Sequence, residues 1–495
     1  MSPMAIGLIF FIFAYFALGV GMYFLVKGSG KRYIICGKSL PFFLVGSMLL
    51  AQSLDANATM GNSAGAYSGG FWAGFQFPLG LALCLILTGL FFAKPLNKMN
   101  LLTLPDFYRR RYSATVEVLV SILMAFSFAI LVAGNFAGSA WIISMVFEVS
   151  YLWALIFVAA FISIYTVSGG LYSCAATDIV QIYPAILGFV GCAFWLLFHY
   201  GWDFFSGAIP PDFLNLSGLM SMEHGALVNW AGIAALAFGD IVALDFMERI
   251  FSARTPEVAS RSCYFGAALT LVTGLACSFI GLMGLKLFPE VADTRMVLTT
   301  IATAGVPFIF GLFVMGGIIG AGASTADGGI LGVSTVLGRN ILQKNAFRVW
   351  ANRKGMDQNK VVSDRHLLII SRCMALPVVA FAIYLAYIKP EPGILLVLAF
   401  DVVFAGCLVP LVLGIYWKKA NAPGALAGVI VGSITRMVLF FTIPEHLAGL
   451  DTLLSPVVCL VVMVAVSLAT QEKHASKHEM IHYIPEDEAV ISGKY

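Results

Sequence analysis

Charged residues are scarce in this sequence. Only 11% of its 495 residues are Asp, Glu, Lys or Arg, and 60% are hydrophobic, whereas soluble proteins carry about 25% charged residues. Apolar runs of about 18 residues or more recur along the chain, and each can cross a ~30 Å hydrocarbon core as a helix. The runs are continuous rather than alternating, which argues against membrane-spanning strands. The composition therefore predicts an all-α polytopic membrane protein.

Motifs for catalysis, metal binding and nucleotide binding are absent as well. The sequence contains no GxxxxGK[ST], no CxxC and no HExxH. Its nine cysteines, from Cys36 to Cys459, lie within predicted spans or at their inner ends, so no disulfide is expected. Basic residues are spread over short loops rather than gathered in one patch, which argues against a nucleic-acid partner. We expect a protein that is not an enzyme and that draws energy from an ion gradient rather than from ATP.

Thirteen apolar segments are predicted to span the membrane. They cover residues 4–26, 41–66, 70–95, 115–146, 150–169, 174–199, 227–250, 262–287, 300–335, 366–388, 393–417, 424–443 and 452–470. An odd number places the two termini on opposite sides of the membrane. Lys and Arg gather in alternate loops, and the positive-inside rule then puts the N-terminus outside and the C-terminus in the cytoplasm.

Polar residues inside the spans gather in three short stretches. These are "AQSLDANATMGN" (51–62), "FGDIVALDFMERIFS" (238–252) and "IIGAGASTADGGIL" (318–331). A carboxylate such as Asp55 costs roughly 2.5–3.5 kcal/mol at the centre of a membrane helix. The first two stretches lie five spans apart, as expected for an inverted repeat of five helices whose first helices are both broken at mid-membrane. Such breaks expose backbone oxygens that can bind an ion or a solute.

The third stretch carries candidate ligands for a hard cation. Ser324 and Thr325 are adjacent, and Ala321 precedes Ser324 by one helical turn. Two hydroxyls and the Ala321 carbonyl can therefore face one point, and sodium prefers such oxygen ligands. Alternatively, the two hydroxyls bond back to carbonyls of the preceding turn, as Ser and Thr often do in membrane helices.

Several longer motifs resemble a known family. "TLPDFYRRRY" (103–112), "SGGLYSCAATDIVQ" (168–181) and "GASTADGGILGVSTVLGRNI" (322–341) are similar to signature stretches of the sodium:solute symporter family. Within it, "LILTGLFFAKP" (85–95), "GGLYSCAATDIVQ" and "GALAGVIVGSITR" (424–436) are most similar to the high-affinity choline transporter branch. The resemblance implies a LeuT-type fold in one transport domain. Its parts would be a leading helix and inner loop (1–40), a first repeat (41–199), a second repeat (227–417), two closing helices (424–470) and a cytoplasmic tail (471–495).

The resemblance also implies a sodium site between the second and the ninth span. Its ligands would be the carbonyls of Ser53, Ala56 and Ala321 and the hydroxyls of Ser324 and Thr325.

Two aspartates match family positions linked to sodium. Asp55 falls where the proline branch needs an aspartate for sodium coupling, and a bound cation would offset its cost. Alternatively, it is a protonated carboxyl that holds the broken helix. Asp178 matches an aspartate near the inner mouth of the sodium path. Alternatively, it caps the helix that starts after Gly170.

The solute is less clearly indicated. Trp141 matches one aromatic position of the choline branch, although it could equally be a packing or lipid-facing residue. Ser53 and Ala243 stand where that branch has tryptophans, so the aromatic cage for a quaternary ammonium is depleted. Asp240 could accept a cationic or amine-bearing solute, pair with Arg249, or bind a second ion or a proton. Further candidates for contacts with the solute are Gln52, Asn57, Phe75, Gln76 and Asn135.

Together these observations predict a sodium-coupled symporter that imports a small polar organic solute by alternating access. Sodium is the one ion expected to bind, and the expected partners are the solute and membrane lipid, without an obligatory protein partner. A proton-coupled carrier using Asp55 or Asp240 and a transport-fold sensor remain alternatives. Because the loops are short and no disulfide is expected, we expect the protein to lie in a bacterial inner membrane.

Overall fold

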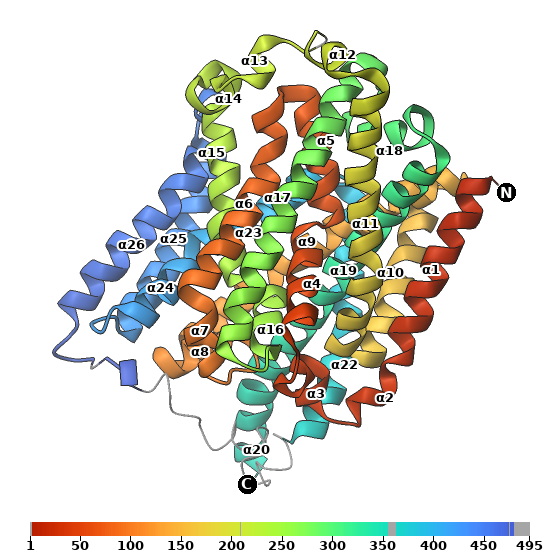
Figure 1. The fold of residues 1–495 in the computed structure, drawn as a ribbon. Coiled ribbons are helices and arrows are strands. Elements are labelled where there is room, and N and C mark those ends of the chain that lie inside the picture. The colour runs from red at the N-terminus through yellow and green to blue at the C-terminus, as the bar shows by residue number, and fades with distance from the viewer. Residues whose placement is uncertain (1, 208, 355–362, 475, 480–495) are drawn as a thin grey trace.

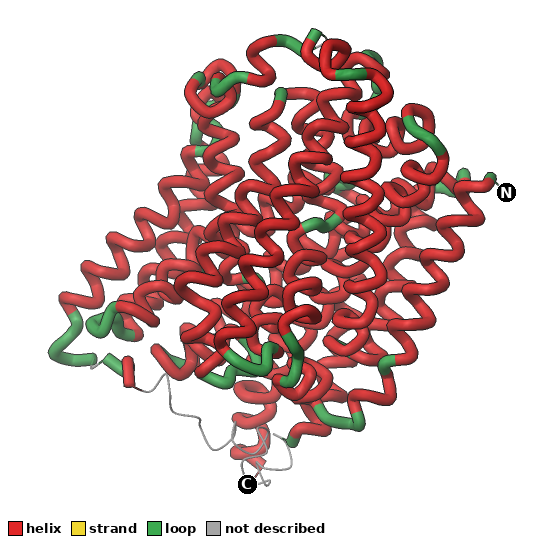
Figure 2. Tube along the Cα trace, in the orientation of Figure 1, coloured by secondary structure: helices red, strands yellow, loops and turns green. Residues whose placement is uncertain are grey.

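The computed structural model describes residues 2–207, 209–354, 363–474 and 476–479. In this part of the chain every regular element is a helix (Figure 2). One isolated parallel bridge joins Leu40 to Ala253 and ties the segment before α4 to the segment after α16. The expected all-α architecture is confirmed.

Ten straight helical segments are long and apolar enough to cross a membrane. Their principal helices are α1 (Pro3–Gly21), α6 (Phe71–Leu87), α9 (Ala114–Phe147), α10 (Tyr151–Gly169), α11 (Leu171–Tyr200), α17 (Pro256–Leu287), α19 (Phe308–Val336), α22 (Asp364–Ile388), α25 (Ala422–Thr442) and α26 (Leu450–Ala469). Two bent pairs raise the number to as many as twelve in the described residues. The one remaining predicted span, the second (41–66), is made of α4 (Phe42–Ser53) and α5 (Ala56–Gly69), of which only α4 is apolar.

The two predicted breaks are present. The first lies between α4 and α5, where Leu54 leaves the helical conformation. The second follows α15 (Ala226–Ala234), the π-helix η4 (Ala235–Gly239) and the 3-10 turn η5 (Asp240–Val242). Ala243 is extended there, with φ −65° and ψ 132°, before α16 (Leu244–Ser252) begins. The chain bends by 50° at this point. A further bend of 45° separates α23 (Pro392–Gly406) from α24 (Leu408–Tyr416).

The ninth predicted span begins later than expected. The prediction started it at residue 300, but α18 (Val297–Thr300) and η7 (Ile301–Gly305) form a separate turn of chain, and α19 starts only at Phe308. Val306 is extended and is followed by Pro307. Proline disfavours the helical conformation in the residue before it, so the apolar run is interrupted at this point.

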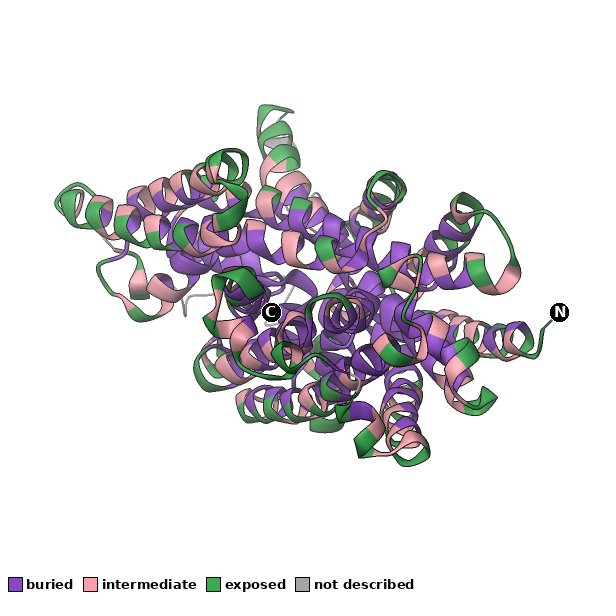
Figure 3. Ribbon diagram, turned by 90° about the horizontal axis from the view of Figure 1, so that it is seen from above, coloured by how far each residue is buried: buried purple, intermediate pink, exposed green. Residues whose placement is uncertain are grey.

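The broken helices lie at the centre of the bundle. Seen from above, buried residues concentrate in the middle of the molecule and exposed residues at its edge (Figure 3). α19 packs against α9, α11 and α22, and it also contacts α4, α5 and α16. α1 packs on α10, α11 and α19 at one edge, and α25 and α26 pack on each other and on α23 at the opposite edge (Figure 1).

Short elements connect the long helices at the two ends. At the lower end of Figure 1 lie α2 (Tyr23–Val26), α3 (Gly30–Ile35), η1 (Cys36–Lys38), η2 (Thr88–Phe92), α7 (Ala93–Lys98), α8 (Leu104–Arg111), the π-helix η8 (Leu337–Phe347) and α20 (Arg348–Lys354). At the upper end lie α12 (Trp202–Ser206), α13 (Pro211–Leu214), α14 (Ser217–Met220), η3 (Met222–His224) and η6 (Thr294–Met296), with η9 (Glu445–Leu447) between α25 and α26.

Candidate functional site

Asp55 stabilises the break in the first broken helix. It is the N-cap of α5, and its Oδ1 accepts the Ala58 backbone N–H at 2.6 Å. Its Oδ2 accepts Asn135 Nδ2 at 2.8 Å and Asn57 Nδ2 at 3.1 Å. A carboxylate at a helix N-terminus also interacts favourably with the helix dipole. These protein donors offset part of the cost of burying Asp55, so the geometry favours the interpretation that it holds the broken helix.

Asn135 and Asn57 therefore both lie at the break, where they bond Asp55. Asn135 on α9 also accepts the Ala56 N–H through its Oδ1 at 3.2 Å, so it contacts both sides of the cap. Asn57 Nδ2 additionally reaches the Leu131 carbonyl at 3.4 Å. Both side chains are completely buried.

The five predicted sodium ligands lie on elements that contact one another. Ser53 ends α4, Ala56 begins α5, and Ala321, Ser324 and Thr325 lie on α19, which packs against both helices. Thr325 Oγ1 donates to the Gln52 carbonyl at 3.3 Å, so α19 touches the end of α4 directly. The helices approach so closely that a Cβ on Gly322 would lie 2.9 Å from the Ala56 Cβ.

The Ser324 and Thr325 hydroxyls do not bond back to carbonyls of the preceding turn. Thr325 bonds across to α4. Ser324 Oγ is buried, makes no hydrogen bond of ordinary geometry, and has the Asp178 carboxylate as its neighbour. Because Ser324 lies beside the ends of α4 and α5, its hydroxyl is a candidate ligand for an ion or a water.

Asp178 faces a buried arginine on the second broken helix. It lies inside α11, whose N-cap is Gly170, so it does not cap that helix. Its Oδ2 is 3.6 Å from Arg249 Nη2, and neither carboxylate oxygen has a hydrogen bond. Arg249 also pairs with Asp245 at 3.3 Å and donates to the Ser324 carbonyl at 3.3 Å. One guanidinium therefore links α11, α16 and α19 beside the candidate ion ligands.

Asp327 was not among the predicted site residues. It is fully buried on α19, and its Oδ2 accepts the Tyr165 hydroxyl at 2.8 Å. The sequence signal was available, because a carboxylate two residues after Thr325 inside a membrane span is itself a marker of function.

Asp240 lies at the second break and is bonded to the first. It belongs to η5, is completely buried, and accepts Gln52 Nε2 from α4 at 3.0 Å. Its second oxygen, Oδ2, has no partner. Arg249 binds Asp178 and Asp245 instead, so the alternative pairing of Asp240 with Arg249 is absent from the structure.

A polar cavity of about 700 Å³ lies toward the upper end of the molecule as drawn in Figure 1, and we call it the upper cavity. It is lined by residues of α5, α6, α15, η6 and α23, including Met60, Gln76, Phe77, Asn229, Arg295 and Glu391. Gln76 Nε2 donates to Asn229 Oδ1 at 3.2 Å and thereby joins α6 to α15.

Phe75 and Trp141 lie outside this cavity. Phe75 stacks on Phe71, with ring centroids 4.8 Å apart. Trp141 stacks on Tyr151, and its Nε1 donates to the Pro390 carbonyl at 3.2 Å. The Arg295 guanidinium lies 5.4 Å from the Trp141 ring centroid, so this ring packs at the upper end of the bundle.

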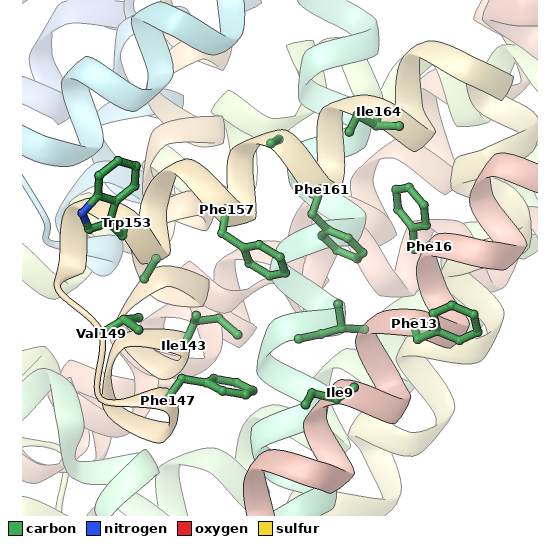
Figure 4. A pocket seen from close by; sticks show the side chains of 13 residues that line it. Ile9, Phe13, Phe16, Ile143, Phe147, Val149, Trp153, Phe157, Phe161 and Ile164 are labelled. Carbon is green, nitrogen blue, oxygen red and sulfur yellow. The ribbon is translucent and has the colours of Figure 1, made fainter. Parts of the chain in front are cut away.

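A second large cavity, of about 760 Å³, has a different character. It lies between α1, α9 and α10 and is lined by apolar side chains such as Phe13, Phe16, Phe157 and Phe161 (Figure 4). Trp153 and Phe13 on its walls are largely exposed on the apolar surface of the bundle. Among the side chains that line it, the Trp153 indole N–H is the one polar group, so this groove offers little to orient a polar solute.

The sequence of this chain is similar to those of several membrane transporters. The chain is similar to high affinity choline transporter 1 of Homo sapiens, with 25% identity over 87% of this chain and 76% of that protein. It is also similar to the sodium/glucose cotransporter of Vibrio parahaemolyticus, with 23% identity over 94% of this chain and 90% of that protein. The sodium/pantothenate symporter of Haemophilus influenzae is 25% identical over 85% of this chain and 87% of that protein.

Solved structures share the architecture. A Na⁺-coupled sialic acid symporter in a substrate-bound outward-open state matches with a TM-score of 0.74 and 15% identity, over 95% of this chain and 98% of that one. A nucleobase-cation-symport-1 family transporter matches with a TM-score of 0.53 and 13% identity, over 91% and 97%. The LeuT-type fold expected from the sequence is thereby confirmed. Residues 33–432 match the model of the sodium:solute symporter family, and the chain belongs to that family.

Proposed function

We propose that this chain is a sodium-coupled symporter that moves a small polar organic solute into the cell by alternating access. The observation that carries the proposal is the contact between α19 and the first break. There the Ser324 hydroxyl is buried without a hydrogen bond of ordinary geometry, on a helix that packs against α4 and α5, whose ends at the break are also buried. Transporters of this architecture place coupling ions and solutes at such discontinuities.

In this proposal sodium binds at the break. Its ligands are the carbonyl oxygens of Ser53, Ala56 and Ala321 and the hydroxyls of Ser324 and Thr325, which fits the preference of a hard cation for oxygen. Asp178 lies on the inner path of the ion and is paired with Arg249. Separation of this pair would open a polar route from the ion site toward the cytoplasm.

The solute enters through the upper cavity, which faces outside. Met60, Gln76 and Asn229 line its wall, and the relatives for choline, glucose and pantothenate show that the family carries small polar solutes. This orientation places the N-terminus outside and the lower end of Figure 1, with its basic loops, in the cytoplasm of a cell membrane. One sodium ion crossing 100 mV supplies about 2.3 kcal/mol, or roughly fiftyfold accumulation of the solute.

Sodium-dependent thermal stabilisation tests the proposal. We expect NaCl to raise the melting temperature of the purified wild type, while KCl at the same ionic strength does not, because only a bound ion stabilises by mass action. The double variant Ser324→Ala/Thr325→Ala removes both hydroxyl ligands and should lose the sodium effect.

Equal responses to sodium and potassium in both proteins would contradict the sodium site and favour proton coupling. Reconstituted protein that binds sodium but accumulates no solute from a broad panel would favour a sensor.

A further inference from the structure

The strongest feature outside the sodium site is the half-satisfied carboxylate of Asp240. The side chain has no exposure, lies at the break of the second broken helix, and receives one hydrogen bond, from Gln52 Nε2. Its Oδ2 has no hydrogen-bond donor, and the neighbouring Cys84 thiol of α6 is at most a weak one. A buried carboxylate in the membrane needs a compensating cation or proton.

The basic side chain closest in sequence is already engaged. Arg249 pairs with Asp178 and Asp245, and its Nη2 also donates to the Ser324 carbonyl. No salt bridge joins Asp240 to a basic residue in the described part of the chain. A cation that compensates the Asp240 carboxylate would therefore come from outside the protein.

Asp240 is enclosed by the broken helices and by helices that line the upper cavity. That cavity is lined by α5, α6, α15 and α23. Deeper in the bundle, Asp240 contacts Gln52 of α4 and lies beside Cys84 of α6, and the adjacent Gly239 packs on the Phe400 carbonyl of α23. α6 and α23 thus contribute both to the wall of the upper cavity and to the surroundings of Asp240, and a route for a solute would follow these two helices.

The residues around Asp240 favour a cation that donates hydrogen bonds over a quaternary ammonium, which has no N–H group. Ser53 beside Gln52 and Ala243 three residues after Asp240 are both small and buried, so neither supplies a ring for a quaternary ammonium. We infer that the solute is a protonated primary or secondary amine whose N–H donates to Asp240 Oδ2, while Gln52 fixes the other oxygen. This inference rests on the proposed function and narrows its solute class.

A matched series of cations tests the inference. Ethanolamine, N-methylethanolamine, N,N-dimethylethanolamine and choline share one skeleton and one positive charge, but each step removes an N–H donor. We expect their stabilisation of the sodium-loaded wild type to weaken along the series. Choline should require a concentration at least about tenfold higher than ethanolamine, because a charge-assisted hydrogen bond is lost.

Asp240→Asn keeps the size of the side chain and removes its charge. We expect this variant to lose the ranking among the four cations and to retain stabilisation by sodium. Glu445→Gln, which removes an exposed carboxyl group in η9, is the control that should keep the wild-type ranking.

Three outcomes would overturn the inference. They are a wild type that prefers choline, a wild type that responds to none of the four cations, and an Asp240→Asn variant that keeps the ranking. The wild-type ranking needs no variant, so it remains decisive if Asp240→Asn fails to fold. Failure of sodium to stabilise the wild type would instead refute the proposed symport function.

Discussion

At the residue scale, the cost of placing polar groups at mid-membrane is met by specific partners. Asp55 is satisfied by a backbone N–H and two asparagines, whereas Asp240 has one donor and Ser324 Oγ has none. Because both of these unsatisfied groups lie at or beside the breaks, they are where the proposed function expects ligands. The satisfied residues maintain the broken backbone that creates those positions.

Asn135→Ala tests whether the satisfied polar residues maintain the broken backbone. The substitution removes a donor to Asp55 Oδ2 and the acceptor for the Ala56 N–H, both buried. An unsatisfied buried group costs about 1–3 kcal/mol, so we expect a lower melting temperature with or without sodium. Ser121→Ala on the same helix is the control, because Ser121 Oγ has no hydrogen-bond partner to lose. Equal melting temperatures for the two variants would contradict the proposed role of Asn135.

At the element scale, α8 connects two segments at the lower end of the bundle. Asp106 in its first turn pairs with Lys344 at 2.6 Å and with Arg339 at 3.2 Å, both on η8. From the last turn, Arg111 donates to the Gly414 and Trp417 carbonyls around the end of α24. Burial raises the pKa of Asp106, but the two basic side chains outweigh it and hold the pKa well below its usual range.

Asp106→Asn tests the importance of this connection. Breaking a buried ion pair costs about 3–5 kcal/mol, so we expect a markedly lower melting temperature at neutral pH. A carboxyl group with a lowered folded-state pKa stabilises the fold above its unfolded pKa, about 3.9. The difference between wild type and variant should therefore be constant from about pH 5 to 8 and shrink progressively below about pH 4. A difference that vanishes near pH 6 would contradict the assignment.

At the scale of the whole molecule, the upper and lower ends differ in access. The upper cavity has an exposed residue, Ser68, on its wall. At the lower end, the network around Asp106 and the Arg249 cluster are buried. Access from the upper end is therefore expected to be greater than access to these two buried groups.

Cysteine labelling tests this arrangement and the orientation of the protein. In a Cys373→Ser background, which removes the one exposed cysteine among the nine, a membrane-impermeant thiol reagent added outside intact cells should label Ser68→Cys. Thr335→Cys, fully buried in the lower half of α19, should stay unlabelled. Labelling of Ser68→Cys only after the inner face is exposed would reverse the proposed topology.

Much of the architecture was predictable from local sequence. The apolar runs gave the long helices, and the polar stretches gave both breaks five spans apart, because hydrophobic length and buried polar cost are local properties. The start of α19 was missed, since the extended Val306–Pro307 step lies inside an apolar run and changes its hydropathy little.

The partners of buried polar groups required the tertiary structure. Asp178 and Arg249, Asp55 and Asn135, Tyr165 and Asp327 are separated by tens to more than a hundred positions and meet only when the helices pack. No local pattern specifies which face of one helix meets another at those depths. The sequence by itself thus determined a broken-helix transporter of the sodium:solute symporter family. Only the packing decided that Asp55 is satisfied within the protein, while one oxygen of Asp240 has no hydrogen-bond donor.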